Sequence, residues 1–136
     1  MRVLCLDVGD KRIGVAVSDA LGMAAHGLKT INREGCMPPL KAVIEEYQEE
    51  IGSILVGLPK MLSGAVGIQG EKVLAFVEEL KCSLQLPVIM WDERLSTVSA
   101  ERALIEAGMS REKRKGLKDK VAAVIILQSY LDSINR

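Results

Sequence analysis

The fold is first indicated by residues 2–18, which read RVLCLDVGDKRIGVAVS. Arg2–Val8 is a β-rich run, and Asp7-Val8-Gly9-Asp10 ends it with a turn signal. Ile13–Ser18 is a second apolar run after a short gap, and roughly Met23–Ile31 is a weaker third. The short gap predicts an antiparallel hairpin, and the three runs together predict a β-meander.

Helices and strands alternate in the rest of the chain, as the spacing of apolar residues indicates. We expect a helix from about Pro38, whose apolar stripe runs from Leu40 to Ile51, and then a strand at Ser53–Leu58. After the glycine-rich Ser63–Gly70 come a helix carrying Val73 to Leu84 and a strand at Pro87–Trp91. The last expected elements are a helix between Ser96 and Gly108, a basic loop at 109–118 and a helix at Asp119–Ile134. The order β-β-β-α-β-α-β-α-α predicts an α/β fold with a mixed sheet and helices on its faces.

Composition narrows the class of protein. The 136 residues are 49% hydrophobic and 26% charged, enough for one core, so we expect a single domain over 1–136. The 18 basic and 18 acidic residues cancel, which excludes a strongly basic nucleic-acid-binding domain but not a basic patch. We expect no membrane span, no signal peptide and, from three scattered cysteines, a cytoplasmic setting. Neither the cysteines nor His26 has the spacing of a metal or nucleophile site.

Acidic residues stand at the ends of three predicted elements. Asp7 ends an apolar strand, where a carboxylate is costly unless a metal or hydrogen-bond donors compensate it; alternatively it begins the turn. Asp92 and Glu93 follow a strand, at the sheet edge where open α/β sheets bind ligands; alternatively they are solvated, and Arg94 pairs with either. One of the two is expected to face a common site, because consecutive strand residues point to opposite faces.

The third acid is Asp119, where the last helix is expected to begin. An acid at that point caps the helix or favours its macrodipole, so alone it carries little functional weight. If the three acids converge, their oxygens suit Mg²⁺ or Mn²⁺. Two such ions activate water and stabilise the leaving oxygen in phosphodiester hydrolysis.

Basic residues form one dense cluster at 111–120, opposed by Glu112 and Asp119. It is either a solvated loop or a loop that contacts phosphates, and its position just before Asp119 favours the second. Candidate nucleic-acid contacts are Lys11, Arg12, Arg94, Arg111, Lys113, Arg114, Lys115 and Lys118. The glycine pair Gly9 and Gly14 has P-loop spacing, but Val15 and Ala16 stand where Lys and Ser or Thr are needed.

Four blocks of the chain resemble one family, in order and spacing. They are DVGDKRIGVA at 7–16, VGLP at 56–59, DERLST at 92–97, and Asp119 followed by AAVIIL at 122–127. Together they resemble the YqgF family, whose members are named pre-16S rRNA nucleases and Holliday-junction resolvases. The chain departs from that family where Met61-Leu62-Ser63 precedes Gly64, which puts polar substrate contacts from this loop in doubt.

The resemblance implies a ribonuclease-H-like fold, with a five-stranded mixed sheet and helices on both faces. It implies that Asp7, Glu93 and Asp119 are catalytic and hold two Mg²⁺ or Mn²⁺ ions, with Asp92 a less suitable neighbour. The activity implied is endonucleolytic processing of the 5′ end of pre-16S rRNA in ribosome biogenesis, which leaves 5′-phosphate and 3′-hydroxyl ends. The implied partner is structured RNA or branched DNA, bound by a monomer or homodimer.

Alternatives remain open from the sequence. A Holliday-junction resolvase in DNA recombination and repair uses the same chemistry, and a non-catalytic RNA-binding assembly factor would keep the acids as structural remnants. ATP hydrolysis is a further alternative, because the turn Asp7-Val8-Gly9 also resembles the first phosphate loop of actin-like kinases. Those enzymes bind nucleotide between two such domains, and 136 residues supply one.

Overall fold

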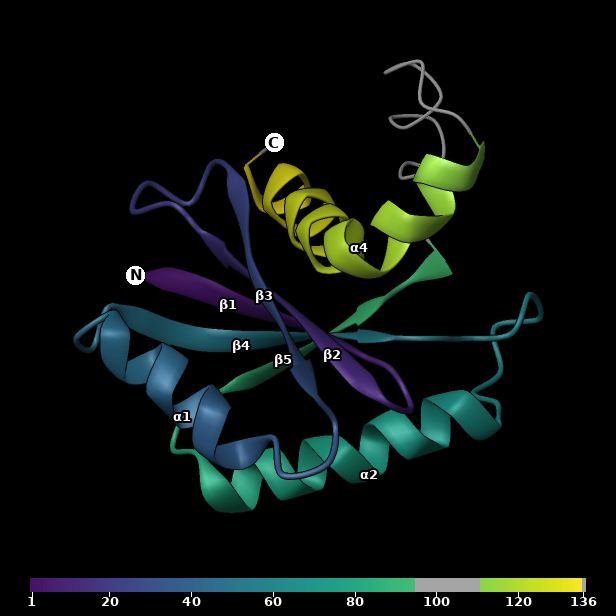
Figure 1. The fold of residues 1–136 in the computed structure, drawn as a ribbon, viewed down its shortest axis with the longest axis horizontal. Coiled ribbons are helices and arrows are strands. Elements are labelled where there is room, and N and C mark those ends of the chain that lie inside the picture. Colours follow the sequence, from purple (N-terminus) through teal and green to yellow (C-terminus); the bar gives the residue numbers. More distant parts are fainter. Residues whose placement is uncertain (95–110, 136) are drawn as a thin grey trace.

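The computed structural model describes residues 1–94 and 111–135, and for 111–121 it describes the backbone but not the side chains. The elements are β1 (Arg2–Val8), β2 (Arg12–Ser18), β3 (Ala25–Asn32), α1 (Met37–Glu46), β4 (Ile51–Leu58), α2 (Ile68–Ser83), β5 (Val88–Asp92) and α4 (Arg111–Ile134). Helices α1 and α2 lie on one side of the sheet and α4 lies on the other (Figure 1). The prediction of an α/β fold with helices on both faces is confirmed.

The five strands form one sheet in the order β3-β2-β1-β4-β5. Strand β1 pairs antiparallel with β2 and parallel with β4, so that Leu6 stands between Val15 and Val56. Strand β5 extends the parallel part and β3 the antiparallel part. The sheet is therefore mixed, as the sequence predicts, and β1 lies at its centre.

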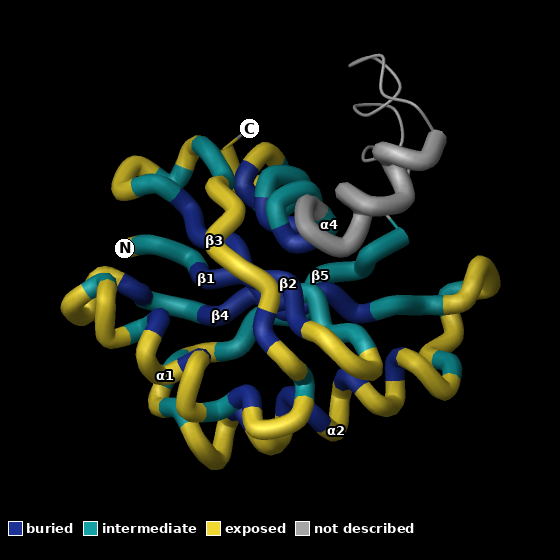
Figure 2. The backbone as a smooth tube through the Cα atoms, viewed as in Figure 1, coloured by how far each residue is buried: buried dark blue, intermediate teal, exposed yellow. Residues whose placement is uncertain are grey.

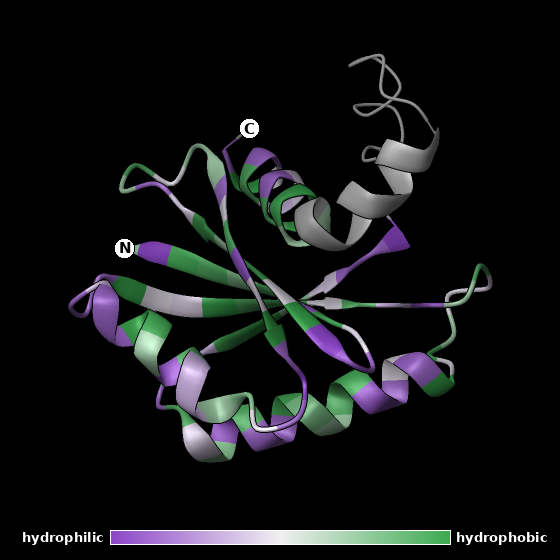
Figure 3. Cartoon of the chain, viewed as in Figure 1, coloured by the Kyte–Doolittle hydropathy of each residue, from purple (hydrophilic) through white to green (hydrophobic). Residues whose placement is uncertain are grey.

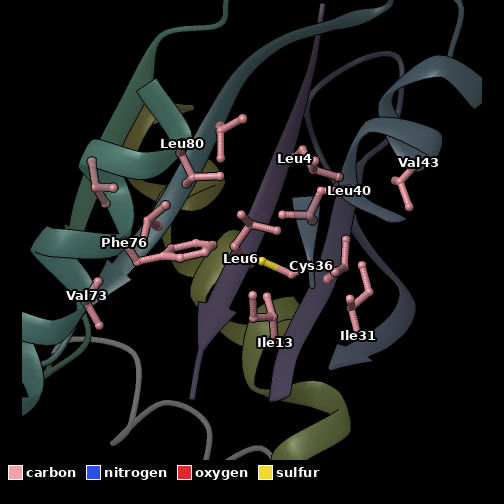
Figure 4. Packing of buried hydrophobic residues seen from close by; sticks show 14 of the residues in the cluster. Leu4, Leu6, Ile13, Ile31, Cys36, Leu40, Val43, Val73, Phe76 and Leu80 are labelled. Carbon is pink, nitrogen blue, oxygen red and sulfur yellow. The ribbon is translucent and has the colours of Figure 1, made fainter. Parts of the chain in front are cut away.

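The larger core lies between the sheet and helices α1 and α2. Leu4 and Leu6 of β1 are fully buried there, against Leu40 of α1 and Phe76 of α2 (Figure 4). The outer sides of both helices are exposed, as Figure 2 shows. Alternate residues of a strand face opposite sides, so the even-numbered positions of β1 supply this core.

The smaller core lies between the sheet and α4. Cys5 and Leu55, neighbours on β1 and β4, are fully buried with Ala123 and Leu127 of α4. Figure 3 shows hydrophobic residues through the middle of the strands and hydrophilic ones at the end of β5. By alternation along β1, Asp7 belongs to the same face as Cys5, so this carboxylate lies on the α4 side of the sheet.

Helix α4 is also tied to the hairpin between β2 and β3. The Gln128 side-chain amide accepts a hydrogen bond from the Ala25 N–H at 2.9 Å and donates to the Met23 carbonyl at 3.0 Å. Near the end of the chain, Asn135 donates to the Gly22 carbonyl at 2.9 Å. These bonds fix the C-terminal part of α4 over β2 and β3. None of the helices in the described part of the chain is long and apolar enough to cross a membrane.

The predicted end of the first helix is wrong. Helix α1 ends at Glu46, so the apolar stripe expected to reach Ile51 stops at Tyr47, and Ile51 is the first residue of β4. Gln48 and Glu49, with φ of 47° and 71°, turn the chain out of the helix. Periodicity misled here because Ile51 is apolar at a helical spacing, although it is buried by the sheet. The helix expected between Ser96 and Gly108 lies outside the described residues.

The predicted start of the last helix, α4, is also wrong. The expected basic loop at 109–118 is helical from Arg111 onward, and Asp119 lies inside α4 instead of at its start. Arg, Lys and Glu are strong helix formers, and one Gly costs a helix only about 1 kcal/mol, so the polar composition predicted a loop wrongly. The effect of a helix dipole falls off within the first turn, so the macrodipole explanation for Asp119 is also wrong.

Candidate active site

Two of the three predicted acids meet at the carboxyl end of the parallel strands. Glu93 follows directly after β5, and its N–H donates to the Leu58 carbonyl at the end of β4, at 3.1 Å. Its side chain forms a hydrogen bond with the side chain of Asp7. Both residues are partly buried, on the face of the sheet that α4 covers. The structure thus joins Asp7 and Glu93, which are far apart in the sequence.

Glycines flank Asp7 on both neighbouring strands. On β2 its partner is Gly14, and on β4 the register that pairs Leu6 with Val56 puts Gly57 beside Asp7. Gly57 pairs in turn with Trp91 of β5. Because cross-strand neighbours share a face, these glycines leave the space around the Asp7 carboxylate free of neighbouring strand side chains.

The Glu93 side chain occupies the space over Gly57. A Cβ atom at position 57 would stand 2.6 Å from Glu93 Oε1 and 2.8 Å from Glu93 Cγ. It would also stand 2.9 Å from Cδ1 of Ile126 on α4. The Glu93 side chain therefore lies between β4 and α4, directed from β5 toward Asp7 on β1.

Burial and the neighbouring acid raise the pKa of Glu93 to about 8. Desolvation is the largest cause, followed by the charge of Asp7 and its hydrogen bond. The same two acids, added to complete burial, raise the pKa of the Cys5 thiol well above its usual value. At neutral pH and without a cation, Glu93 is therefore expected to keep its proton, because a second charge beside Asp7 in this buried place is costly.

Asp92 forms an ion pair with Arg94. Its carboxylate binds Arg94 in a bidentate ion pair, with Nη2–Oδ2 at 2.7 Å and Nε bonded to both oxygens, and the pair holds the pKa of Asp92 below its ordinary value. Arg94 also reaches the carbonyls of Met61 and Leu62 at 3.4 Å. The expectation that one of the two neighbouring acids faces the site fits this geometry, with Glu93 as that acid.

The turn between β1 and β2 borders the site. A cavity of about 190 Å³ there is lined by Asp7, Gly9, Asp10, Lys11, Arg12, Gly14 and Thr30. The Gly9 N–H donates to the Arg12 carbonyl at 2.8 Å, and a Cβ on Gly9 would stand 2.8 Å from that oxygen, so the tight turn requires glycine. Asp10 accepts hydrogen bonds from Gln69 and Lys72 of α2, which anchors the turn. The cations Lys11 and Arg12 line the same cavity as Asp7.

The third acid and the basic cluster lie on α4. Position 119 precedes Ala123 by four residues and Ile126 by seven, so helical periodicity places it on the face of α4 that these two buried residues share. The five predicted contacts Arg111, Lys113, Arg114, Lys115 and Lys118 lie on the first two to three turns of the same helix. Their side chains, like that of Asp119, are outside the described part.

The donor set fits a hard divalent cation. Among the described side chains no group of three or more potential ligands is close enough to hold a metal, and two carboxylates meet at Asp7 and Glu93. Carboxylate oxygens are what Mg²⁺ and Mn²⁺ prefer. A cation between the two carboxylates would favour the ionised form of Glu93, which burial and Asp7 otherwise disfavour.

Sequence reasoning missed several features of this site. Gly57 reads simply as the end of a strand, and Thr30 as one residue of a weak strand. The strand register places both residues at the site, with Gly57 beside Asp7 and Thr30 opposite Gly14. The signal that could have found them is the pair of glycines, Gly14 and Gly57, each inside an apolar stretch, 13–17 and 54–58.

Solved structures with the same fold include two resolvases. The chain matches the fowlpox virus resolvase in complex with Holliday junction DNA, with a TM-score of 0.56, 14% identity and full coverage of both chains. It matches RuvC of Thermus thermophilus, also in complex with a Holliday junction substrate, with a TM-score of 0.53 and 14% identity over 99% of this chain and 96% of that one. The fold is ribonuclease-H-like, and the acid pair lies at the carboxyl edge of its parallel strands.

Sequence comparison then identifies the family. The chain belongs to the RuvX family, described as Holliday junction resolvase, whose model matches residues 1–133. It is 56% identical to the protein of Clostridium novyi named "Putative pre-16S rRNA nuclease", over 98% of this chain and all of that one. It is 57% identical to the protein of the same name from Desulforamulus reducens, over 98% of each chain. The resemblance to the YqgF family is confirmed.

Proposed function

We propose that this chain is a divalent-metal-dependent endonuclease that processes the 5′ end of pre-16S rRNA in the cytoplasm. The observation that carries the proposal is the hydrogen-bonded pair of Asp7 and Glu93 at the carboxyl edge of a ribonuclease-H-like sheet. The relatives' shared name indicates the RNA. The family description and the DNA in the two resolvase complexes favour a four-way DNA junction as a second candidate substrate.

Three acids would hold Mg²⁺ or Mn²⁺: Asp7, Glu93 and Asp119. Asp7 and Glu93 would supply oxygens from β1 and from the end of β5. Asp119, which belongs to α4, would supply the third. When bound, such cations lower the pKa of an attacking water and stabilise the departing 3′ oxygen. The protein's own contribution is to fix the acids: Glu93 is held at its backbone by Leu58 and packed at its side chain between β4 and α4.

Basic residues would bind the nucleic-acid backbone on both sides of the acid pair. Lys11 and Arg12 line the cavity beside Asp7, and Arg111, Lys113, Arg114, Lys115 and Lys118 belong to the start of α4. Arg94, whose guanidinium binds Asp92 and the loop after β4, would face a phosphate only as part of that ion pair. Contacts of this kind position a backbone without reading its sequence, so substrate shape would decide where cleavage occurs.

A cleavage assay tests the proposal. The purified protein is incubated with an RNA that spans the mature 5′ end of 16S rRNA and its leader, or with a four-way DNA junction, in Mg²⁺, Mn²⁺ or EDTA. We expect cleavage of the RNA in the presence of metal, with 5′-phosphate products, and none in EDTA. Cleavage of the junction alone would assign the resolvase activity instead. Binding without cleavage of either substrate in any metal would contradict a nuclease.

The turn cation Lys11 gives a separate prediction about binding. Replacing Lys11 by Ala removes one phosphate contact, so RNA should bind more weakly, and the slope of log Kd against log salt concentration should fall by about one. The measurement is RNA binding by fluorescence anisotropy in Ca²⁺ at several salt concentrations. The control is Lys41→Ala, an exposed lysine on α1, across the sheet from the site. An unchanged slope for Lys11→Ala would remove this residue from the interface.

A further inference from the structure

Gly57 is a glycine inside a β-strand, and the proposed chemistry does not by itself require a glycine there. It is the last residue but one of strand β4 and is buried, although glycine is a poor strand former. No positive φ calls for glycine here, because the positive-φ glycines of the described residues are Gly22, Gly35 and Gly64. The reason for a glycine at position 57 must therefore be the space around it.

The atoms around Gly57 identify what uses that space. The site of a Cβ would be 2.6 Å from Oε1 and 2.8 Å from Cγ of Glu93, and 2.9 Å from Cδ1 of Ile126. Real Cβ atoms essentially never approach other heavy atoms below 3.0 Å. Glu93 has little freedom to yield, because its N–H is bonded to the Leu58 carbonyl and its side chain to Asp7.

We propose that Gly57 is the positioning residue for Glu93. Because Gly57 has no side chain, the Glu93 side chain can lie directly over its α-carbon and reach Asp7. A methyl group at position 57 would lift the carboxylate off β4 and away from β1. Ile126 closes the same space from α4, so the glutamate is held between a backbone and an apolar side chain. Gly57 acts through Glu93 and touches no substrate. This inference rests on the proposed function only for its consequence in cleavage.

Another glycine of the same strand provides a matched control. A Cβ on Gly52 would meet the side chain of Met1, with Cβ at 2.8 Å and Sδ at 3.0 Å. Met1 precedes β1 and is 83% exposed, so its backbone and side chain can shift together. Gly52→Ala and Gly57→Ala thus make the same substitution in one strand, the first against a movable neighbour and the second against a fixed one.

A stability cycle tests the contact without reference to activity. Gly57→Ala should lower the melting temperature of the metal-free protein by about 5 °C or more, and should lower it much less when Glu93 is already Ala, because the obstructed side chain is then gone. Gly52→Ala should have nearly the same small effect in both backgrounds. Equal losses from Gly57→Ala in the two backgrounds would overturn the proposed contact, whether or not the protein is a nuclease.

A second pair of variants separates positioning from packing against α4. In Gly57→Ala/Ile126→Val the isoleucine Cδ1 is removed, which relieves the clash with α4 but not the one with Glu93. We expect the melting temperature to recover in part, while the cleavage rate stays about 100-fold below that of Ile126→Val alone, and Mn²⁺ affinity at least about tenfold below. Recovery of cleavage together with stability would overturn the positioning role. If the parent neither cleaves nor binds Mn²⁺, the proposed function fails, and the stability cycle still decides the contact.

Discussion

Asp7→Asn is expected to slow cleavage of the RNA by about 10³-fold or more while leaving the protein folded. The substitution keeps the shape of the side chain and its hydrogen bonding, but it removes the charge on β1 around which the site is built. Stabilisation of developing charge by a bound metal is worth several kcal/mol, and about 4 kcal/mol corresponds to this factor. Single-turnover cleavage in Mn²⁺ measures the loss, and circular dichroism checks the fold.

The matched control for Asp7→Asn is Asp132→Asn. Asp132 is exposed on α4 and accepts a hydrogen bond from Gln128 at 2.9 Å, away from the acid pair. It makes the same change of charge, so it should retain cleavage within about twofold. A similar decrease in both variants would mean that overall charge, and not the site, controls the rate. Parent-like cleavage by Asp7→Asn would remove Asp7 from the chemistry.

Glu93→Gln is expected to have opposite effects on cleavage and on stability. The pKa of Glu93 is raised from 4.5 to about 8 in the folded protein, so between these values the folded state binds the proton that the unfolded state has lost. Stability of the metal-free parent should therefore fall as pH rises from 4.5 to 8. A glutamine amide can donate to Asp7 as the protonated acid does, and it cannot ionise. The variant should be more stable than the parent by about 4 kcal/mol at pH 8, with the difference vanishing below pH 4.5.

Urea unfolding in EDTA across this pH range measures the stability effect. Glu45→Gln, at an exposed position of α1, is the control and should follow the parent at every pH. A Glu93→Gln variant with the parent's pH dependence would show that Glu93 is not the group whose ionisation opposes folding. In the cleavage assay, Glu93→Gln should lose activity about as strongly as Asp7→Asn, because it removes the partner charge.

The strands were predictable because their apolar residues are continuous or alternate between clear turn signals. Arg2–Val8 is an almost continuous apolar run that ends in a turn signal, as suits a strand covered on both faces. Helix α4 was less predictable at its start, since its first turns are charged and resemble a solvated loop until helix propensity is weighed. Ile51 shows the converse error, an apolar residue at a helical spacing that belongs to a strand.

The acids of the site could be named from the sequence, but their geometry could not. Motif resemblance singled out Glu93 over Asp92, and the structure supplies the reason. Asp92 is bound by Arg94, whereas the Glu93 side chain lies over Gly57 of β4. The role of Gly57 depends on the register of β4 against β1 and β5 and on the placement of Ile126. Contacts between residues this far apart follow from tertiary packing, which no local pattern encodes.

If Asp7 and Glu93 form a metal site, a calorimetric titration of Mn²⁺ into the metal-free protein at pH 7.5 detects it. We expect the parent and Asp132→Asn to bind Mn²⁺ with the same affinity and with release of the Glu93 proton. Asp7→Asn should bind Mn²⁺ at least about tenfold more weakly. Equal Mn²⁺ affinity in the parent and Asp7→Asn, or no binding by the parent, would contradict a metal site at this acid pair.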